Sequence, residues 1–302
     1  MESKMIIFGG SAGEALAVRV ANLAGAKLGK IDQKRFPDGE KYCRVLDDVK
    51  GDDVVIIHPT GGRPDELIIE YLMLVDTIKD MAPKSISAVF PYFAYARQDA
   101  RFNPGEPLSF HLMTRLIEQI GTNKVYTIDL HLQRITDMGE IFKIPAHNLT
   151  AVPYIADYIS KIYSPKNAAV IGPDMESEQW AKVAAAKIKT DYAVLEKTRF
   201  SATDVKIRAR GGEALNVQGR DAIIIDDIIS TGNTIIEAAQ LVKKAGANRI
   251  YVGCTHPVLS GNALAKMYAA GIEAVVGTDT FPGPISFVSV APVIAEALKK
   301  RA

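Results

Sequence analysis

DAIIIDDIISTGNTIIEAAQLVKKAG, residues 221–246, joins a short apolar run, two acidic residues, a turn rich in hydroxyl groups and an amphipathic segment. The apolar run predicts a strand over Ala222–Ile225 that ends at Asp226 and Asp227, and the amphipathic segment predicts a helix over Asn233–Ala245. In open α/β sheets, ligands bind outside the carboxyl ends of the strands. The stretch therefore predicts an α/β fold with a ligand site at this turn.

The turn between this strand and helix, STGNT at Ser230–Thr234, has the properties of a phosphate-binding loop. Backbone N–H groups at a helix N-terminus are free to donate, and the helix dipole favours a negative charge there. The carboxylates of Asp226 and Asp227 suit the two vicinal hydroxyls of a ribose. The turn departs from the GxxxxGKS/T pattern of Walker-type loops. A second interpretation, in which Ser230 and Thr231 only cap the helix, would suffice for an STG tripeptide alone.

The composition is that of a globular protein, with 48% hydrophobic and 24% charged residues, and 302 residues leave room for two domains. The chain has 36 basic and 35 acidic residues, a formal net charge of +1. Proteins that bind nucleic acids or membrane surfaces in general carry a basic excess or a basic stripe. We therefore expect neither partner, and we expect any phosphate chemistry to be local.

Several features predict a cytoplasmic location. Cys43 and Cys254 are the only cysteines, too few for the disulfide framework of a small secreted protein. The N-terminus, MESKMIIFGG, has too short an apolar stretch for a signal peptide. The longest charge-free stretch, Thr280–Ala295, contains three prolines and is shorter than a membrane span.

Short apolar runs alternate with amphipathic segments along the chain, which predicts parallel strands joined by helices. In the first half we expect strands at Met5–Phe8, Asp53–His58, Ile86–Phe90 and Val125–Ile128, and helices at Pro64–Met81 and Ser109–Ile120. In the second half we expect strands also at Ala168–Ile171, Ala193–Leu195, Ile250–Gly253 and Ala274–Val276, and helices also at Glu176–Ile188 and Gly261–Ala270. Lys41–Leu46 is predicted to be an antiparallel flap. The repeated scheme predicts two similar α/β halves that meet near Ile144–Pro153.

The nine residues Asp226–Thr234 resemble the ribose-5-phosphate loop of the phosphoribosyltransferase fold, and further motifs narrow the resemblance to one family. These motifs are RFPDGE (35–40), FPYFAYARQDAR (90–101), TIDLH (127–131) with IGPDMES (171–177), and LEKTRF (195–200). Together they resemble the ribose-phosphate pyrophosphokinase family over nearly the whole chain, in the family's order and spacing.

The resemblance implies an ATP-dependent enzyme with Mg²⁺ as cofactor and ATP and ribose 5-phosphate as substrates. The β,γ-diphosphate of ATP would pass to the C1 hydroxyl of ribose 5-phosphate, giving 5-phosphoribosyl 1-diphosphate and AMP. It also implies a homo-oligomer and two phosphoribosyltransferase-type domains. Residues 1–148 would supply ATP and metal contacts, and residues 149–302 the ribose-5-phosphate loop and a catalytic lid. The C-terminal helix, 291–302, could pack back on the first domain.

The resemblance assigns ATP contacts on the flap, which would reach into a neighbouring subunit, and on the loop that follows the third expected strand. These residues are Phe36, Asp38, Gly39, Glu40, Arg97 and Gln98. An arginine fork matches phosphate oxygens well, so Arg97 is placed near the phosphates and Gln98 nearer the base. Asp99 and Arg101 are supporting candidates. Without the resemblance, PDG would be an ordinary turn and YARQDAR an exposed polar turn.

The resemblance also assigns two metal ligands and a lid. His131 would bind the magnesium on the ATP phosphates, although Mg²⁺ usually prefers oxygen ligands and a lone histidine is more often structural. Asp174 would bind a second metal near ribose 5-phosphate, or would only cap a helix. Lys197 and Arg199 lie in the family's mobile catalytic loop and would neutralise the transferred diphosphate.

Ribose 5-phosphate contacts come from the loop and the lid in this resemblance. They are Arg199, Asp226, Asp227, Ser230, Thr231, Gly232, Asn233 and Thr234. Asp226 is also a candidate general base, although no residue is distinguished as one.

Two other functions remain open from the sequence. A phosphoribosyltransferase acting on a nucleobase would share the ribose loop but would not need the DGE, RQD and KTR segments. A catalytically silent regulatory relative would lack lid or metal residues, or would carry a basic module for nucleic acid. Formation of AMP from ribose 5-phosphate and ATP distinguishes these classes.

Overall fold

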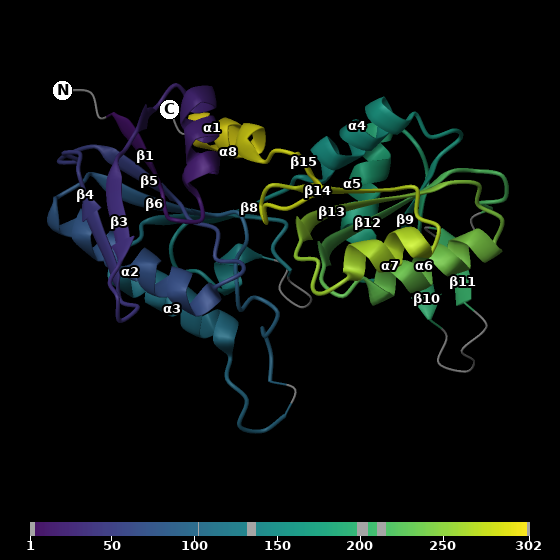
Figure 1. Ribbon diagram of the computed structural model, residues 1–302, viewed down its shortest axis with the longest axis horizontal. Coiled ribbons are helices and arrows are strands. Elements are labelled where there is room, and N and C mark those ends of the chain that lie inside the picture. Colours follow the sequence, from purple (N-terminus) through teal and green to yellow (C-terminus); the bar gives the residue numbers. More distant parts are fainter. Residues whose placement is uncertain (1–3, 102, 132–136, 198–204, 210–215, 301–302) are drawn as a thin grey trace. The chain divides into compact units, whose positions relative to one another are not determined.

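The computed structural model describes residues 4–101, 103–131, 137–197, 205–209 and 216–300 (Figure 1). The chain divides into two compact units, one formed by Met1–Leu149 with Val290–Ala302 and the other by Thr150–Ser289. Each unit contains a mainly parallel sheet flanked by helices, so the predicted α/β architecture is confirmed. None of the described helices is long and apolar enough to cross a membrane.

The main sheet of the first unit has six strands in the order β2-β1-β5-β6-β7-β8, and all neighbours are parallel. The strands are β1 (Met5–Gly9), β2 (Lys27–Leu28), β5 (Asp53–Ile57), β6 (Ser85–Phe90), β7 (Lys124–Ile128) and β8 (Ala146–Leu149). The described helices are α1 (Glu14–Ala24), α2 (Pro64–Asp80), α3 (Ser109–Ile120), the short 3₁₀ helix η1 (Met138–Glu140) and α8 (Ala291–Lys299). Figure 1 shows α1 and α8 on one face of the sheet and α2 and α3 on the other. Because both faces are covered, central strands such as β5 are apolar runs rather than alternating ones.

A separate hairpin lies outside this sheet. Its strands, β3 (Ile31–Arg35) and β4 (Lys41–Val45), are antiparallel, with Ile31 opposite Val45 and Arg35 opposite Lys41. The hairpin packs against α2 through β4. The predicted antiparallel excursion is therefore confirmed, and residues 36–40 form the turn at its tip.

The second unit has a seven-stranded sheet in the order β11-β10-β9-β12-β13-β14-β15, parallel except at the β10–β11 edge. The strands are β9 (Ala169–Gly172), β10 (Tyr192–Lys197), β11 (Val205–Ala209), β12 (Ala222–Ile229), β13 (Ile250–Pro257), β14 (Ala274–Thr278) and β15 (Ser286–Val288). The described helices are α4 (Val152–Tyr163), α5 (Glu178–Ile188), α6 (Asn233–Lys244) and α7 (Ala263–Ala269). α4 and α5 cover one face, and α6 and α7 the other (Figure 1).

Strand β12 differs from the expectation that it ends at Asp226 and Asp227. It continues to Ile229, because β13 is equally long and pairs with it from Ile250 to Pro257. Ile229 is buried, and the burial of its apolar side chain stabilises the continuation of the strand beyond the acidic pair. The two carboxylates therefore lie on a paired strand rather than on a loose strand end, which fixes their positions.

Candidate active site

The loop after β12 has an uncapped helix N-terminus. α6 begins at Asn233 with Gly232 as its N-cap, and no side-chain hydrogen bond from the described residues caps it, so the alternative interpretation, in which Ser230 and Thr231 only cap the helix, finds no support. The first intrahelical bond is donated by Ile236 to the Gly232 carbonyl at 2.9 Å, which leaves the N–H groups of the preceding residues without helical partners. Thr231, Asn233 and Thr234 are exposed. The arrangement can bind a phosphate through backbone N–H groups and hydroxyls.

Gly232 is required by its backbone conformation. Its φ is +78°, in the left-handed region that favours glycine. A Cβ at this position would meet Met267 Cγ at 3.4 Å and Ala263 Cβ at 3.6 Å, which are ordinary contacts with α7. The glycine is therefore needed for the shape of the turn, and crowding by a side chain is a lesser factor.

A second loop holds the turn from the side. The β13–α7 segment donates backbone hydrogen bonds from Leu259 to the Ile229 carbonyl and from Ser260 to the Ser230 carbonyl, both at 2.9 Å. The hydroxyls of Ser230 and Ser260 are 3.2 Å apart. Ser260 escaped the sequence analysis because its role depends on pairing between two loops about 30 residues apart in the chain.

Asp226 and Asp227 precede this loop on β12, and the charge of Asp174 acts on Asp226 as well. The Asp226 Oδ1 atom accepts a hydrogen bond of 3.0 Å from the Asp227 N–H group. Burial, followed by the negative charges of Asp227 and Asp174, raises the pKa of Asp226 well above its ordinary value. Negative charge is therefore concentrated at Asp226, as expected where a cation and ribose hydroxyls bind.

Asp174 lies in a tight turn between β9 and α5. Its Oδ1 atom accepts from the Ser177 N–H at 3.0 Å, and the buried Ser177 hydroxyl donates to the Asp174 carbonyl at 2.6 Å. A Cβ on Gly172 would meet Ser177 Oγ at 2.6 Å, so this glycine lets the turn close. The N-cap of α5 is Ser177, and no side-chain hydrogen bond within the described part of the chain caps this helix, so Asp174 holds the preceding turn and does not cap the helix. Metal binding is compatible with this turn, because only one carboxylate oxygen serves it. Ser177 and Gly172 were not assigned roles from the sequence.

We expect that the acidic cluster folds under electrostatic strain, which gives a stability prediction. Because folding raises the pKa of Asp226, the folded state binds this proton more tightly than the unfolded chain. The free energy of unfolding should therefore fall as pH rises above the ordinary carboxyl pKa of 3.8. Asp226→Asn removes the charge but keeps the acceptor for Asp227. We expect it to raise the melting temperature at pH 7 without metal, by about 2–4 °C for each kcal/mol of relieved repulsion.

Melting curves in EDTA test this expectation over a range of pH. The gain in melting temperature should shrink as pH falls toward 4, and ribose 5-phosphate affinity should fall in the same variant. If folded Asp226→Asn had an unchanged or lower melting temperature at pH 7, this result would contradict the expected electrostatic strain at Asp226.

In the first unit, His131 follows β7 on a turn that Asn148 of β8 holds in place. Asn148 Oδ1 accepts from the Thr127 hydroxyl and from the Leu130 N–H, both at 3.0 Å. Asp129 has a φ of +39° and is buried. His131 is half-buried. The neighbouring β8 thus fixes the strand end that carries the expected metal ligand, a role the sequence did not reveal.

Arg97 and Gln98 lie on the loop after β6, at the same carboxyl edge of the sheet as His131. The Gln98 side-chain oxygen accepts from the Ser109 hydroxyl at 3.2 Å, and its carbonyl accepts from the Phe110 N–H at 3.4 Å. These bonds tie the loop to the start of α3. The Arg97 side chain is exposed.

The hairpin tip presents Phe36 and two carboxylates to solvent. Phe36 is 42% exposed, and its ring contacts Tyr42 edge-on at 6.0 Å between centroids. Gly39, with a φ of +99°, closes the turn by donating to the Phe36 carbonyl at 2.9 Å. Asp38 and Glu40 are exposed. An aromatic ring and two acids at an exposed tip suit contact with a base on another molecule.

The tip end of the hairpin is fixed to α2 by buried charge, because Lys41 directly follows the turn. Lys41 forms ion pairs with Glu70, which is 3% exposed, and with Glu66 at 3.0 Å. Burial alone would raise the pKa of Glu70, but hydrogen bonds from Lys41 and Ser11 outweigh it and hold the pKa below its ordinary value. The pair keeps the hairpin in one position, so its tip is presented by a stiff support.

Of the predicted lid segment, residues 196–212, the structure describes residues 196–197 and 205–209. Lys197 is the last residue of β10 and is opposite Val205 of β11. Arg199 lies outside the described residues. Among those that are described, no three His, Cys, Asp or Glu side chains form a group that could hold a metal ion by themselves. Mg²⁺ commonly takes one or two protein carboxylates and completes its shell with phosphates and water, so Asp174 beside Asp226 and Asp227 fits it.

Comparison with known proteins agrees with this geometry. The family described as the N-terminal domain of ribose phosphate pyrophosphokinase matches residues 5–121, and the phosphoribosyl synthetase-associated domain matches residues 189–300. Ribose-phosphate pyrophosphokinase of Methanothermobacter thermautotrophicus is 38% identical over 97% of this chain and 100% of its own length. Ribose-phosphate pyrophosphokinase 1 of Archaeoglobus fulgidus is also 38% identical, with the same coverage of both chains.

A solved structure is similar over the whole chain as well. The phosphoribosylpyrophosphate synthetase of Mycobacterium smegmatis superposes with a TM-score of 0.84 and 27% identity, covering 99% of each chain. The resemblance inferred from five sequence motifs is thereby confirmed. On its motifs, its fold and its full-length relatives, this chain belongs to the ribose-phosphate pyrophosphokinase family.

Proposed function

We propose that this protein transfers the β,γ-diphosphate of Mg-ATP to the C1 hydroxyl of ribose 5-phosphate, giving 5-phosphoribosyl 1-diphosphate and AMP. The observation that carries the proposal is the uncapped N-terminus of α6 next to the acidic pair on β12. A sugar phosphate needs both features, one for its phosphate and one for its hydroxyls. Relatives named ribose-phosphate pyrophosphokinase, matched over their full length, support the same reaction.

Ribose 5-phosphate would lie with its phosphate on the loop Ser230–Thr234. The free N–H groups of the first turn of α6 would donate to the phosphate, with the exposed hydroxyls of Thr231 and Thr234 beside them. Asp226 and Asp227 would accept from the ribose hydroxyls. The raised pKa of Asp226 means that its charged form is poorly stabilised, so hydrogen bonds from ribose hydroxyls would favour that form.

ATP would bind at the carboxyl edge of the first sheet. Arg97 would contact its phosphates, Gln98 would lie nearer the base, and the hairpin tip with Phe36, Asp38 and Glu40 would complete the base pocket of a neighbouring subunit. The exposure of the tip and the ion pairs of the adjoining Lys41 with α2 support this assignment. The proposal therefore includes a homo-oligomer.

His131 would hold the Mg²⁺ of the ATP phosphates, and Asp174 would hold a second Mg²⁺ near ribose 5-phosphate; Mg²⁺ supplies positive charge to the polyphosphate when bound. In the reaction the C1 oxygen forms a bond to the β-phosphorus, and the bond from that phosphorus to the oxygen bridging to the α-phosphate breaks. AMP leaves with this oxygen. Lys197 and Arg199 would stabilise the charge on the transferred diphosphate, since such transfers depend on alignment and charge rather than on a covalent protein intermediate.

Incubation of the purified protein with ribose 5-phosphate, ATP and Mg²⁺ tests the reaction. AMP and 5-phosphoribosyl 1-diphosphate should appear in equal amounts, and no AMP should appear without ribose 5-phosphate. Consumption of 5-phosphoribosyl 1-diphosphate with a nucleobase, and no AMP formation from ATP, would instead favour a phosphoribosyltransferase. An inert, folded protein would favour a silent relative.

A subunit-mixing experiment tests the shared ATP site. Lys197→Ala and Asp38→Ala homo-oligomers should each be nearly inactive. Mixed oligomers should regain part of the activity, up to about a quarter in a 1:1 mixture if each site takes one hairpin from one neighbour. Activity should be measured after subunit exchange has been verified with differently tagged chains. If verified hybrids remain inactive, the ATP site lies within one chain.

A further inference from the structure

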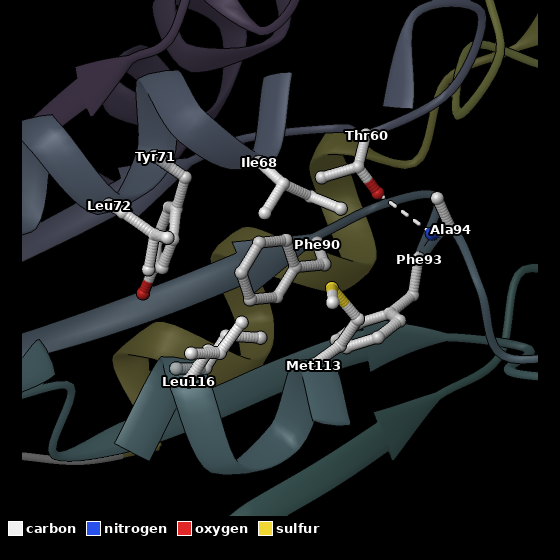
Figure 2. A pocket seen from close by; sticks show the side chains of 10 residues that line it. Thr60, Ile68, Tyr71, Leu72, Phe90, Phe93, Ala94, Met113 and Leu116 are labelled. Carbon is white, nitrogen blue, oxygen red and sulfur yellow. Dashed lines mark hydrogen bonds between the residues drawn. The ribbon is translucent and has the colours of Figure 1, made fainter. Parts of the chain in front are cut away.

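Thr60 lies beyond the carboxyl end of β5 and holds the loop that follows the neighbouring strand β6. Its N–H and its hydroxyl both donate to the Tyr92 carbonyl at 2.9 Å. The same hydroxyl oxygen accepts from the Ala94 N–H at 2.8 Å, the bond drawn in Figure 2. Thr60 is 3% exposed, so these bonds are shielded from water. A single hydroxyl thus acts as donor and acceptor for two positions of the loop, a role that valine cannot fill.

An apolar contact anchors the loop between these two bonds. The ring of Phe93 packs against Phe90 and Phe110, with centroids 5.1 and 5.5 Å away. Figure 2 shows Phe93 beside Met113 in a pocket that Thr60 also lines. The free space there is about 10 Å³, no more than a single water would need, so the pocket is packed core rather than a ligand site.

Tyr95, two residues after Phe93, adopts an unfavourable backbone conformation. Its φ is +66°, which non-glycine residues rarely adopt, and such outliers cluster at functional sites. Its hydroxyl donates to a carboxylate oxygen of Asp65 in the first turn of α2. Its carbonyl accepts from the Gln98 N–H at 3.5 Å. The turn at Tyr95 is therefore held on one side by Thr60 and on the other by Asp65, and it directs the chain toward Arg97 and Gln98.

We propose that Thr60 and Tyr95 are positioning residues for ATP, holding the loop so that Arg97 and Gln98 are presented before the nucleotide arrives. The inference rests on the proposed ATP role of those two residues. Loss of the Thr60 hydroxyl would leave the buried Ala94 N–H without a partner and would release the turn at Tyr95. ATP binding would then have to order the loop, which lowers affinity without affecting the ribose site.

Thr60→Val and Thr60→Ser form the central comparison. Valine has nearly the same shape as threonine, so we expect Thr60→Val to raise KM for ATP about tenfold, while KM for ribose 5-phosphate stays within twofold. Thr60→Ser keeps the donor and the acceptor and should behave like the wild type. Tyr95→Phe removes only the bond to Asp65 from a partly exposed ring, and it should raise KM for ATP about threefold. Thr77→Val, on the exposed side of α2, is the matched control and should change neither KM.

Hydrogen exchange of the Ala94 amide distinguishes the two ways in which this proposal could fail. The expected result is faster exchange in Thr60→Val together with weaker ATP binding, measured by calorimetry. Faster exchange with unchanged ATP affinity would overturn the ATP role of the loop. Weaker ATP binding with unchanged exchange would overturn the proposal that the Thr60 hydroxyl holds the loop. An equal loss of ATP affinity in Thr60→Ser would overturn it as well. If Thr60→Val does not fold, an unchanged KM for ATP in Tyr95→Phe would overturn the positioning role.

Discussion

Lys197→Ala is expected to lower kcat by about a hundredfold or more, because one preorganised positive charge beside the transferred diphosphate lowers the activation barrier by ~3 kcal/mol. The KM values for ATP and ribose 5-phosphate should change much less, since the charge acts on the transition state. Lys197 is the last residue of β10, opposite Val205 of β11. Initial rates at saturating concentrations of both substrates provide the measurement.

Lys182→Ala serves as the matched control, because it removes an exposed lysine from α5 of the same unit. It should leave kcat unchanged. Near-normal turnover in folded Lys197→Ala would contradict the role of this lysine. An equal loss in both variants would show that the effect comes from overall charge or stability rather than from the lid.

Gly232→Val should damage ribose 5-phosphate binding far more than ATP binding. A β-branched residue at a φ of +78° is strained by about 1–3 kcal/mol, and the turn would relax by moving its N–H groups away from the phosphate. We expect ribose 5-phosphate affinity to fall ten- to a hundredfold and ATP affinity to stay within twofold. The variant should remain folded, because the Cβ meets α7 at ordinary contact distances. Calorimetric titration of each ligand is the measurement.

Gly271→Val provides the control for general strain. Gly271 also has a positive φ, +86°, and has nothing near the position of its Cβ. This substitution should lower stability while leaving ribose 5-phosphate affinity unchanged. Equal losses of affinity in the two variants, or none in Gly232→Val, would contradict the assignment of the phosphate loop.

Most of the buried strands and several helices were predicted closely from the sequence, but the 12-residue helix α4 was missed. Ser109–Ile120 was predicted with its observed bounds, and α2 within one residue, because their apolar periodicity and terminal residues are local signals. α1 was missed, since its start at Gly13 has no capping side chain. β8 was missed because two exposed polar residues, His147 and Asn148, interrupt its apolar pattern. The end of β12 was misplaced because pairing with β13 outweighed the local acidic signal.

The chemistry-bearing residues were easier to find than the residues that support them. Asp226 and the STGNT turn follow a strand in the sequence, so their place at a sheet edge could be predicted. Thr60 and Asn148 support other segments through bonds to positions up to 34 residues away, and no local pattern reveals such partners. Gly232 was assigned to the ribose-5-phosphate loop from the sequence, and its positive φ gives the physical reason why this turn needs a glycine.

The fate of the β-phosphorus of ATP tests the central claim most directly. ATP carrying ³²P at the β position should be incubated with ribose 5-phosphate, Mg²⁺ and the protein, and the products separated. All transferred label should appear in 5-phosphoribosyl 1-diphosphate and none in AMP, because the bond between the bridging oxygen and the β-phosphorus breaks. Label found in ADP, with a sugar product that has gained a single unlabelled phosphate at C1, would show transfer of the γ-phosphate alone and would contradict the proposed diphosphate transfer.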